Sequence, residues 1–136
     1  MKASAIPERR ISSYLIALRP HQWLKNALVA FPAVTSHDFS VGTLITVLIA
    51  SVSFSFGASS VYLLNDMRDL PHDLGHAEKR HRPLAAGLVP FSHAVILLGV
   101  VGALSAYFAS RLPPAFVFVL MIYFWAVHEL FALFQA

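Results

Sequence analysis

The sequence contains no cysteine, and only 12% of its 136 residues are charged. Without cysteine, the chain has no disulfide framework, no thiolate zinc site and no cysteine nucleophile. Soluble proteins carry charge on roughly a quarter of their residues, so this chain has too little charge to cover a surface that faces water. The six glycines are scattered and form no glycine-rich phosphate loop. Soluble nucleotide-binding folds therefore have no support.

Apolar residues dominate instead, at 57% of the chain, and the mean hydropathy is +0.66. A helix needs about 20 mostly apolar residues to cross the roughly 30 Å of bilayer hydrocarbon. Four stretches reach or approach this length: residues 23–36, 39–64, 84–110 and 112–127. Pro32 interrupts the first stretch, and we expect helices to start near Pro90 and Pro114. The prediction is an all-α integral membrane bundle of about four transmembrane helices, a single domain over residues 1–136.

The basic residues are concentrated in two places. Five of the ten Lys and Arg residues precede residue 39 and four lie between Arg68 and Arg82, whereas Arg111 stands alone. Cytoplasmic loops are enriched in Lys and Arg. We therefore expect a multi-pass protein of the cell inner membrane, with residues 1–17 as a cytoplasmic tail and residues 65–83 as a cytoplasmic loop. This distribution suits a membrane protein better than a nucleic-acid-binding protein, so no nucleic-acid partner is expected.

Three aspartates, Asp66, Asp69 and Asp73, follow the second apolar stretch at spacings i, i+3 and i+7. On a continuing helix these offsets fall within roughly 60° of one another, so the three carboxylates would share one face. Carboxylates held so close repel unless a cation lies between them, and their hard oxygens suit magnesium or a magnesium-bound phosphate. Pro71 removes a helical hydrogen bond, so the helix could end between Asp69 and Asp73 and leave Asp73 to reach the site from a loop.

A basic run, Lys79-Arg80-His81-Arg82, follows a few residues later. Cations beside a group of carboxylates are what a phosphorylated substrate requires, because a metal neutralises part of its charge and Lys or Arg binds the remaining oxygens. The two features together indicate diphosphate chemistry. The alternative interpretation is structural: the same side chains cap helices, form exposed salt bridges and set the orientation in the membrane.

Residues 65–73 resemble the first acidic motif of the UbiA superfamily of membrane prenyltransferases, N-D-x-x-D-x-x-x-D, at every fixed position. Residues 18–26, L-R-P-H-Q-W-L-K-N, are similar to a signature of one branch of that family, which includes polyprenyl-phosphate (decaprenyl-phosphate) phosphoribosyltransferases. Residues 79–87 also resemble this branch. The resemblance by motif therefore covers the chain from about residue 18 to residue 89.

This resemblance implies an all-helical membrane enzyme with Mg²⁺ at its site. It implies that Asp66, Asp69 and Asp73 hold the metal and form the catalytic centre. The implied reaction transfers a phosphoribosyl group from a diphosphate donor, phosphoribosyl diphosphate, to an isoprenoid lipid substrate, a polyprenyl phosphate that enters from the membrane lipid. Residues implied in binding these substrates are Asn65, Lys25, Asn26, Lys79, Arg80 and Arg82.

The chain departs from the family because a second acidic motif belongs to a half of the fold that has no counterpart here. We interpret the 136 residues as the N-terminal part of the UbiA-type fold and expect little or no transferase activity from this polypeptide by itself. We also expect self-association or a complementing membrane chain. Two alternatives stay open: prenyl transfer from a prenyl diphosphate to an aromatic acceptor, and a non-catalytic four-span membrane protein with a structural or partner-binding role.

Overall fold

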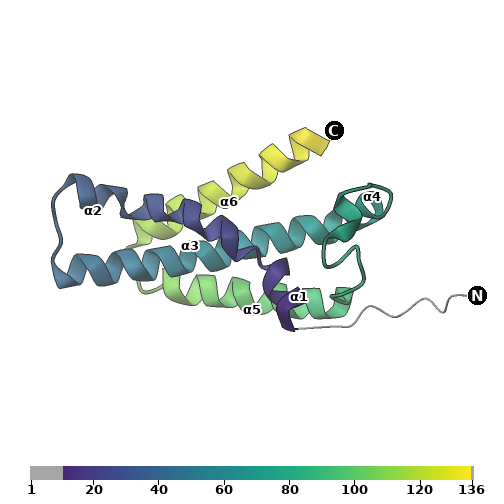
Figure 1. Cartoon of the computed structure of the whole chain (residues 1–136). Coiled ribbons are helices and arrows are strands. Elements are labelled where there is room, and N and C mark those ends of the chain that lie inside the picture. Colours follow the sequence, from purple (N-terminus) through teal and green to yellow (C-terminus); the bar gives the residue numbers. More distant parts are fainter. Residues whose placement is uncertain (1–10, 136) are drawn as a thin grey trace, which may run out of the picture.

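The computed structural model describes residues 11–135, apart from the side chains at 25–29, 32, 131, 134 and 135. The described residues form helices joined by turns and contain no β-strand, which confirms the all-α prediction (Figure 1). The helices in chain order are α1 (Ile11–Ala17), the 3-10 helix η1 (Pro20–Ala30), α2 (Phe31–Thr35), α3 (Val41–Arg68), α4 (Leu70–Leu74), the short 3-10 helix η2 (Lys79–His81), α5 (Phe91–Ala109) and α6 (Pro114–Gln135).

Helix α3 is the central element, because α1, η1, α5 and α6 all contact it. It begins after Ser40, whose hydroxyl oxygen accepts a hydrogen bond from the Thr43 backbone N–H at 3.3 Å. Such a cap satisfies one of the free amides at a helix start. The helix runs past the expected end at residue 64 and carries Asn65 and Asp66 in its last turn.

Helix α5 packs along α3 through small side chains and runs in the opposite direction (Figure 1). Ser53 Oγ donates to the Ser105 carbonyl at 2.9 Å, and Ser105 Oγ donates back to the Ser53 carbonyl at 2.8 Å. Both serines are buried, so each hydroxyl gains a partner that apolar surroundings would not offer. The helix begins directly after Pro90, as expected. Residues 84–89 form turns instead of helix, because Gly87 adopts a left-handed φ of 76°.

Helix α6 begins at Pro114, as expected, and continues past residue 127 to its end at Gln135. Its aromatic side chains pack on Phe54 of α3, whose ring centroid lies 4.7 Å from that of Tyr123 and 6.1 Å from that of Phe116. In Figure 1 the helix crosses the bundle at an angle, so that its C-terminus stands away from α5. The α6 helix is therefore less completely packed than α5.

Two helices, α3 and α5, are long and apolar enough to cross a membrane by length and composition. The apolar part of α6, Pro114–Leu130, is shorter. Residues 23–36 do not form one helix, because η1 gives way to α2 at Phe31. Two of the four predicted spans therefore pass this test in the described part of the chain, and the other two stay predictions.

The first described helix, α1, packs against the bundle. Residues 1–10 of the expected cytoplasmic tail lie outside the described residues, and the cytoplasmic location of residues 1–17 stays a prediction. Ser13 and Ala17 of α1 are buried one turn apart, as expected for a helix with one face on a core. Ala17 belongs to an apolar cluster that surrounds Leu63, one turn before Asp66 on α3; its other members are Leu84, Val89 and Ala94. This cluster supports the end of α3 that carries the acidic motif.

Candidate functional site

Asp66 lies in the last turn of α3 and is 2% exposed. Its Oδ1 accepts hydrogen bonds from Arg19 Nη2 at 2.7 Å and from Arg82 Nη1 at 3.1 Å. The two arginines come from segments on either side of α3 in the sequence. A buried carboxylate needs such charged partners, because desolvation of an unpaired charge costs several kcal/mol.

Asp73 comes from the next helix, α4, and is 1% exposed. Pro71 stands in the first turn of α4, and α3 already ends at Arg68, so the interruption comes before Asp69 and not between Asp69 and Asp73. Asp73 therefore reaches the site from a short helix and not from a loop. Asp73 Oδ2 accepts a hydrogen bond from Arg82 Nη1 at 3.1 Å. Asp73 Oδ1 is buried and has no hydrogen-bond partner within the described part of the chain. One nitrogen of Arg82 therefore bridges two buried carboxylates, and one carboxylate oxygen is left without a donor.

Asp69 lies at the junction of α3 and α4 and is half-buried. Its N–H donates to the Asn65 carbonyl at 2.8 Å, and its carbonyl accepts from the Asp73 N–H at 2.8 Å. Among the described residues, no three His, Cys, Asp or Glu side chains are placed to hold a metal together. The structure thus brings together Asp66 and Asp73 and does not add Asp69 to one three-carboxylate cluster. Asn65 is buried, and its Nδ2 lacks a hydrogen-bond partner in the described chain.

The predicted phosphate-binding cations fall into separate positions. Arg82 is at the site, whereas Lys79 is half-buried and Arg80 exposed on the neighbouring helix η2. Lys25 and Asn26 lie in η1, and their side chains are outside the described residues. Of the predicted cations whose side chains are described, Arg82 alone contacts the carboxylates.

Arg19 is a site residue that the sequence-based selection missed. Its backbone has a positive φ of 52°, and its guanidinium lies 5.0 Å from the centre of the Tyr62 ring. Ser59 Oγ donates to the carbonyl of the preceding residue, Leu18, at 2.7 Å, and accepts from Trp23 Nε1 at 2.9 Å. Arg19 belongs to the motif at residues 18–26, so the sequence did mark this segment. The motif does not predict that Arg19 contacts Asp66.

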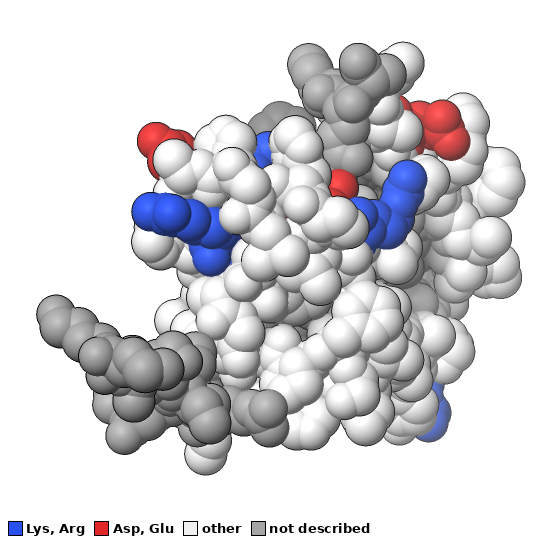
Figure 2. Space-filling view, turned by 90° about the vertical axis from the view of Figure 1, so that its right-hand side faces the viewer, with Lys and Arg blue, Asp and Glu red and all other residues white. Residues whose placement is uncertain are grey.

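A cavity of about 370 Å³ opens beside these charges. Arg19, Asp66 and Arg82 line it together with Ile16, His21, Glu78, His81 and Pro83. Figure 2 looks onto the end of the molecule that carries α4 and shows basic and acidic side chains interspersed in the upper part of this face. An anionic ligand in this cavity would meet two guanidinium groups, and a cation would meet Asp66. The arrangement can therefore bind an anion together with its counter-ion.

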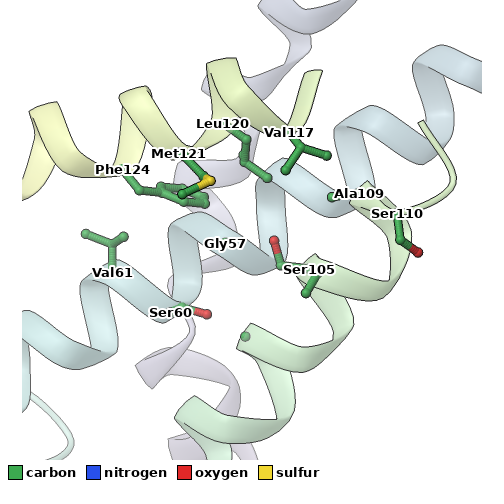
Figure 3. A pocket seen from close by; sticks show the side chains of 12 residues that line it. Gly57, Ser60, Val61, Ser105, Ala109, Ser110, Val117, Leu120, Met121 and Phe124 are labelled. Carbon is green, nitrogen blue, oxygen red and sulfur yellow. The ribbon is translucent and has the colours of Figure 1, made fainter. Parts of the chain in front are cut away.

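A second cavity, of about 470 Å³, lies between α3, α5 and α6. Figure 3 shows Met121 and Phe124 of α6 projecting towards the α3 backbone at Gly57. A Cβ atom at Gly57 would collide with the Phe124 ring and come within 2.9 Å of Ser105 Oγ, so only glycine permits this approach. The walls are mainly apolar, including Val61, Val117 and Leu120. This cavity suits a hydrocarbon chain and offers no charged group.

Comparison with known proteins identifies a family whose sequence model matches this chain. Residues 25–130 match the model of the UbiA prenyltransferase family. This match begins within the first motif block, residues 18–26, and continues past the other two to include α3, α4, α5 and most of α6.

Among curated proteins, the chain is 47% identical over 91 residues to the decaprenyl-phosphate phosphoribosyltransferase of Corynebacterium glutamicum, which covers 65% of this chain and 27% of the relative. It is 39% identical over 123 residues to the Mycobacterium tuberculosis protein of the same name, covering 86% of the chain and 40% of the relative. The Mycolicibacterium smegmatis protein of that name is 36% identical over 123 residues, with 86% and 38% covered. The chain therefore spans less than half the length of these relatives.

Proposed function

The chain belongs to the UbiA prenyltransferase family, and from this premise we propose that it carries the cation- and diphosphate-binding part of a membrane transferase. The reaction is the transfer of a phosphoribosyl group from phosphoribosyl diphosphate to a polyprenyl phosphate. The observation that carries the proposal is the buried pair Asp66 and Asp73, bridged by Arg82 at the wall of a cavity. The names of the three relatives support the choice of transferred group and acceptor.

Mg²⁺ is the cation we propose for this site. The residues present fit it, because carboxylate oxygens are its preferred protein ligands and Asp73 Oδ1 is buried without a hydrogen-bond partner in the described chain. Asp66 and Asp73 would hold the ion, with Asp69 as a third acid at the helix junction and Asn65 in support. Bound Mg²⁺ would neutralise charge on a diphosphate leaving group.

The chain's own cations would bind the phosphate oxygens. Arg82 lines the cavity beside Asp66, and Lys79 and Arg80 are on the helix just before it. Guanidinium groups suit this role because they present several N–H donors in one plane. For Lys25 and Asn26 the substrate-binding role rests on the motif alone.

The lipid substrate would lie in the apolar cavity between α3, α5 and α6. Its α3 residues Gly57 and Val61 precede Asp66 on the same helix by about 8–14 Å at 1.5 Å per residue. An isoprenoid chain held there could present its phosphate to the charged end of α3. Members of this family are integral membrane proteins, and we propose the inner membrane, with the acidic motif and the N-terminus on the cytoplasmic side.

The test is binding of phosphoribosyl diphosphate to the purified chain in detergent, with and without Mg²⁺, compared with prenyl diphosphates. We expect Mg²⁺-dependent binding of phosphoribosyl diphosphate and its loss in Asp66→Ala. The matched control is Asp38→Ala, which removes an exposed carboxylate at the other end of α3. A preference for prenyl diphosphates would instead favour prenyl transfer to an aromatic acceptor. A folded chain that binds neither ligand would favour a structural or partner-binding role.

We also propose that transfer requires helices beyond these 136 residues, supplied by the same polypeptide, by a second copy of this chain or by a complementing membrane chain. The chain spans 27–40% of the length of the three relatives, and the charged cavity is lined by one acidic motif. We expect little or no transfer by the purified chain alone and a larger than monomeric species by light scattering in detergent. Efficient transfer by a monodisperse monomer would contradict this.

A further inference from the structure

The two arginines at the acidic site are held in different ways. Arg19 is fixed at several points: its guanidinium lies over Tyr62 and 2.7 Å from Asp66 Oδ1, and Ser59 binds the carbonyl just before it. Its side chain is also the less exposed of the two, at 23% against 28% for Arg82. Arg19 is therefore built into the packing of η1 on α3.

The backbone of Arg82 is fixed by hydrogen bonds with Lys79 and Ala86, whereas its side chain is held by its charge contacts. Arg82 follows η2 in an extended conformation, and one nitrogen, Nη1, lies 3.1 Å from Asp66 Oδ1 and 3.1 Å from Asp73 Oδ2. Both distances exceed the roughly 2.7–2.9 Å of strong charge-assisted hydrogen bonds. A single positively charged nitrogen placed equally between two carboxylates occupies the position that a shared cation would take.

The arginine satisfies the two acids incompletely. Asp73 Oδ1 is buried and has no hydrogen-bond donor in the described part of the chain. Leaving a buried acceptor unpaired is unfavourable, and more so when the group is charged. A divalent cation takes six or more oxygen ligands and could engage oxygens that a planar guanidinium does not reach. Replacement of the Arg82 guanidinium by a metal ion would therefore give the two carboxylates more complete coordination.

A cavity beside the two carboxylates offers space for the Arg82 side chain. Arg82 lines this 370 Å³ cavity together with Arg19, His21 and His81. A guanidinium that left the two carboxylates would still lie beside this cavity, because Arg82 is part of its wall. There it would face the position that we propose for the phosphate groups.

We propose that Arg82 is an exchangeable counter-ion of the acidic motif. It bridges Asp66 and Asp73 in the cation-free protein, yields this position to a divalent cation, and then binds the phosphate oxygens of the anion that accompanies the cation. Arg19 keeps its contact with Asp66 throughout. Arg82 thereby couples loading of the cation to binding of the diphosphate. This inference rests on the proposed function, since it requires a divalent cation at the motif.

Mn²⁺ is a suitable probe, because carboxylate sites for Mg²⁺ also accept it and the free ion is measured by electron paramagnetic resonance. The full chain in detergent is titrated with Mn²⁺, without and with inorganic pyrophosphate, as wild type, Arg82→Gln and Arg19→Gln. We expect Arg82→Gln to bind Mn²⁺ about tenfold more tightly than wild type without pyrophosphate, a coupling of ordinary size. The same variant should lose the increase in pyrophosphate retention that Mn²⁺ gives the wild type. Arg19→Gln should show no gain in Mn²⁺ affinity.

Arg82→Lys serves as the matched variant, because it keeps a positive charge and should retain affinity near that of the wild type. Circular dichroism and size-exclusion profiles of each variant show whether it is folded. Should a folded Arg82→Gln bind Mn²⁺ as the wild type does, or more weakly, the exchange is refuted while the metal site stands. Should no folded form of the chain bind Mn²⁺, the proposed function fails and this inference fails with it.

Discussion

Helix α3 has an aspartate at each end, and the two occupy opposite surroundings. Asp38, just before the helix, is exposed and accepts hydrogen bonds from the Ser40 N–H at 3.1 Å and the Thr43 hydroxyl at 2.7 Å. Asp66, in the last turn, is 2% exposed and is bound by two arginines. The partners of Asp38 are at most five positions away in the sequence. Those of Asp66 are 47 and 16 positions away.

The difference shows what each carboxylate can do. An exposed carboxylate is solvated, so its local hydrogen bonds order a helix start without organising anything farther away. A buried carboxylate must draw charged partners from remote segments. Asp66 therefore gathers η1, α3 and the turn after η2 at one point, and that point is where a ligand with charges can be held. The cavity beside Asp66 agrees with this reading.

The largest effect is expected from Asp66→Asn. The change leaves Arg19 without its carboxylate partner and Arg82 with Asp73 alone, and loss of one partner from a buried ion pair costs about 3 kcal/mol of unfolding free energy. Thermal or denaturant unfolding in detergent measures it. Asp38→Asn is the control and should have a much smaller effect. Equal losses at the two ends would abolish the distinction between them.

The second effect concerns the middle of α3. In Gly57→Ala the added methyl group collides with the Phe124 ring, so the ring or α6 must shift, which should cost about 2 kcal/mol. Gly99→Ala is the matched control, since no atom lies within 4 Å of its added Cβ. The double variant Gly57→Ala with Phe124→Ala should lose less stability than the sum of its single variants. An additive result would show that the two residues do not meet.

These contrasts also explain how far the fold could be predicted. Apolar length predicted α3 and α5, and the helix starts at Pro90 and Pro114 followed from the local effect of proline. The helix at residues 11–17 was not predicted, because its buried face includes a polar residue, Ser13, and so lacks a clear apolar pattern. The predicted apolar stretch 84–110 begins before helix α5 does, because residues 84–89 form turns around Gly87 in its left-handed conformation.

The candidate site followed the same rule. The spacing of Asp66, Asp69 and Asp73 pointed to a segment in which two carboxylates do lie together, and the proline indicated an interruption of the helix, although α3 ends earlier than expected, at Arg68. Spacing could not tell which carboxylates converge, since that is decided by the break between α3 and α4 and by Arg82. Arg19 was visible as part of a motif, but its partner lies 47 positions away. The local effect of a residue on the helix that contains it can be predicted from the sequence, whereas contacts between distant segments cannot.

A smaller effect tests the pairing of α3 with α5. Ser53→Ala and Ser105→Ala each remove one hydrogen bond from a side-chain hydroxyl to the carbonyl of the other residue, and each should cost about 0.6 kcal/mol of unfolding free energy, the average for hydrogen bonds between membrane helices. Thr46→Ala is the control, because its hydroxyl bonds to Gly42 within the same helix. An equal loss in Thr46→Ala would mean that the effect is not specific to the pairing of α3 with α5.

The smallest effect returns to Asp38 and concerns pH. Hydrogen bonds from the Thr43 hydroxyl and the Ser40 N–H hold the pKa of the Asp38 carboxyl below its usual value of 3.8. A carboxylate with a lowered pKa in the folded state stabilises the fold above its unfolded pKa and loses that contribution as the pH falls through the folded value. The difference in unfolding midpoint between wild type and Asp38→Asn should therefore be constant above roughly pH 5 and shrink below about pH 4. Because other acids titrate in both proteins, only this difference reports on Asp38. A difference that grows towards low pH would mean that the neutral carboxyl, and not the charged one, is favoured at the start of α3.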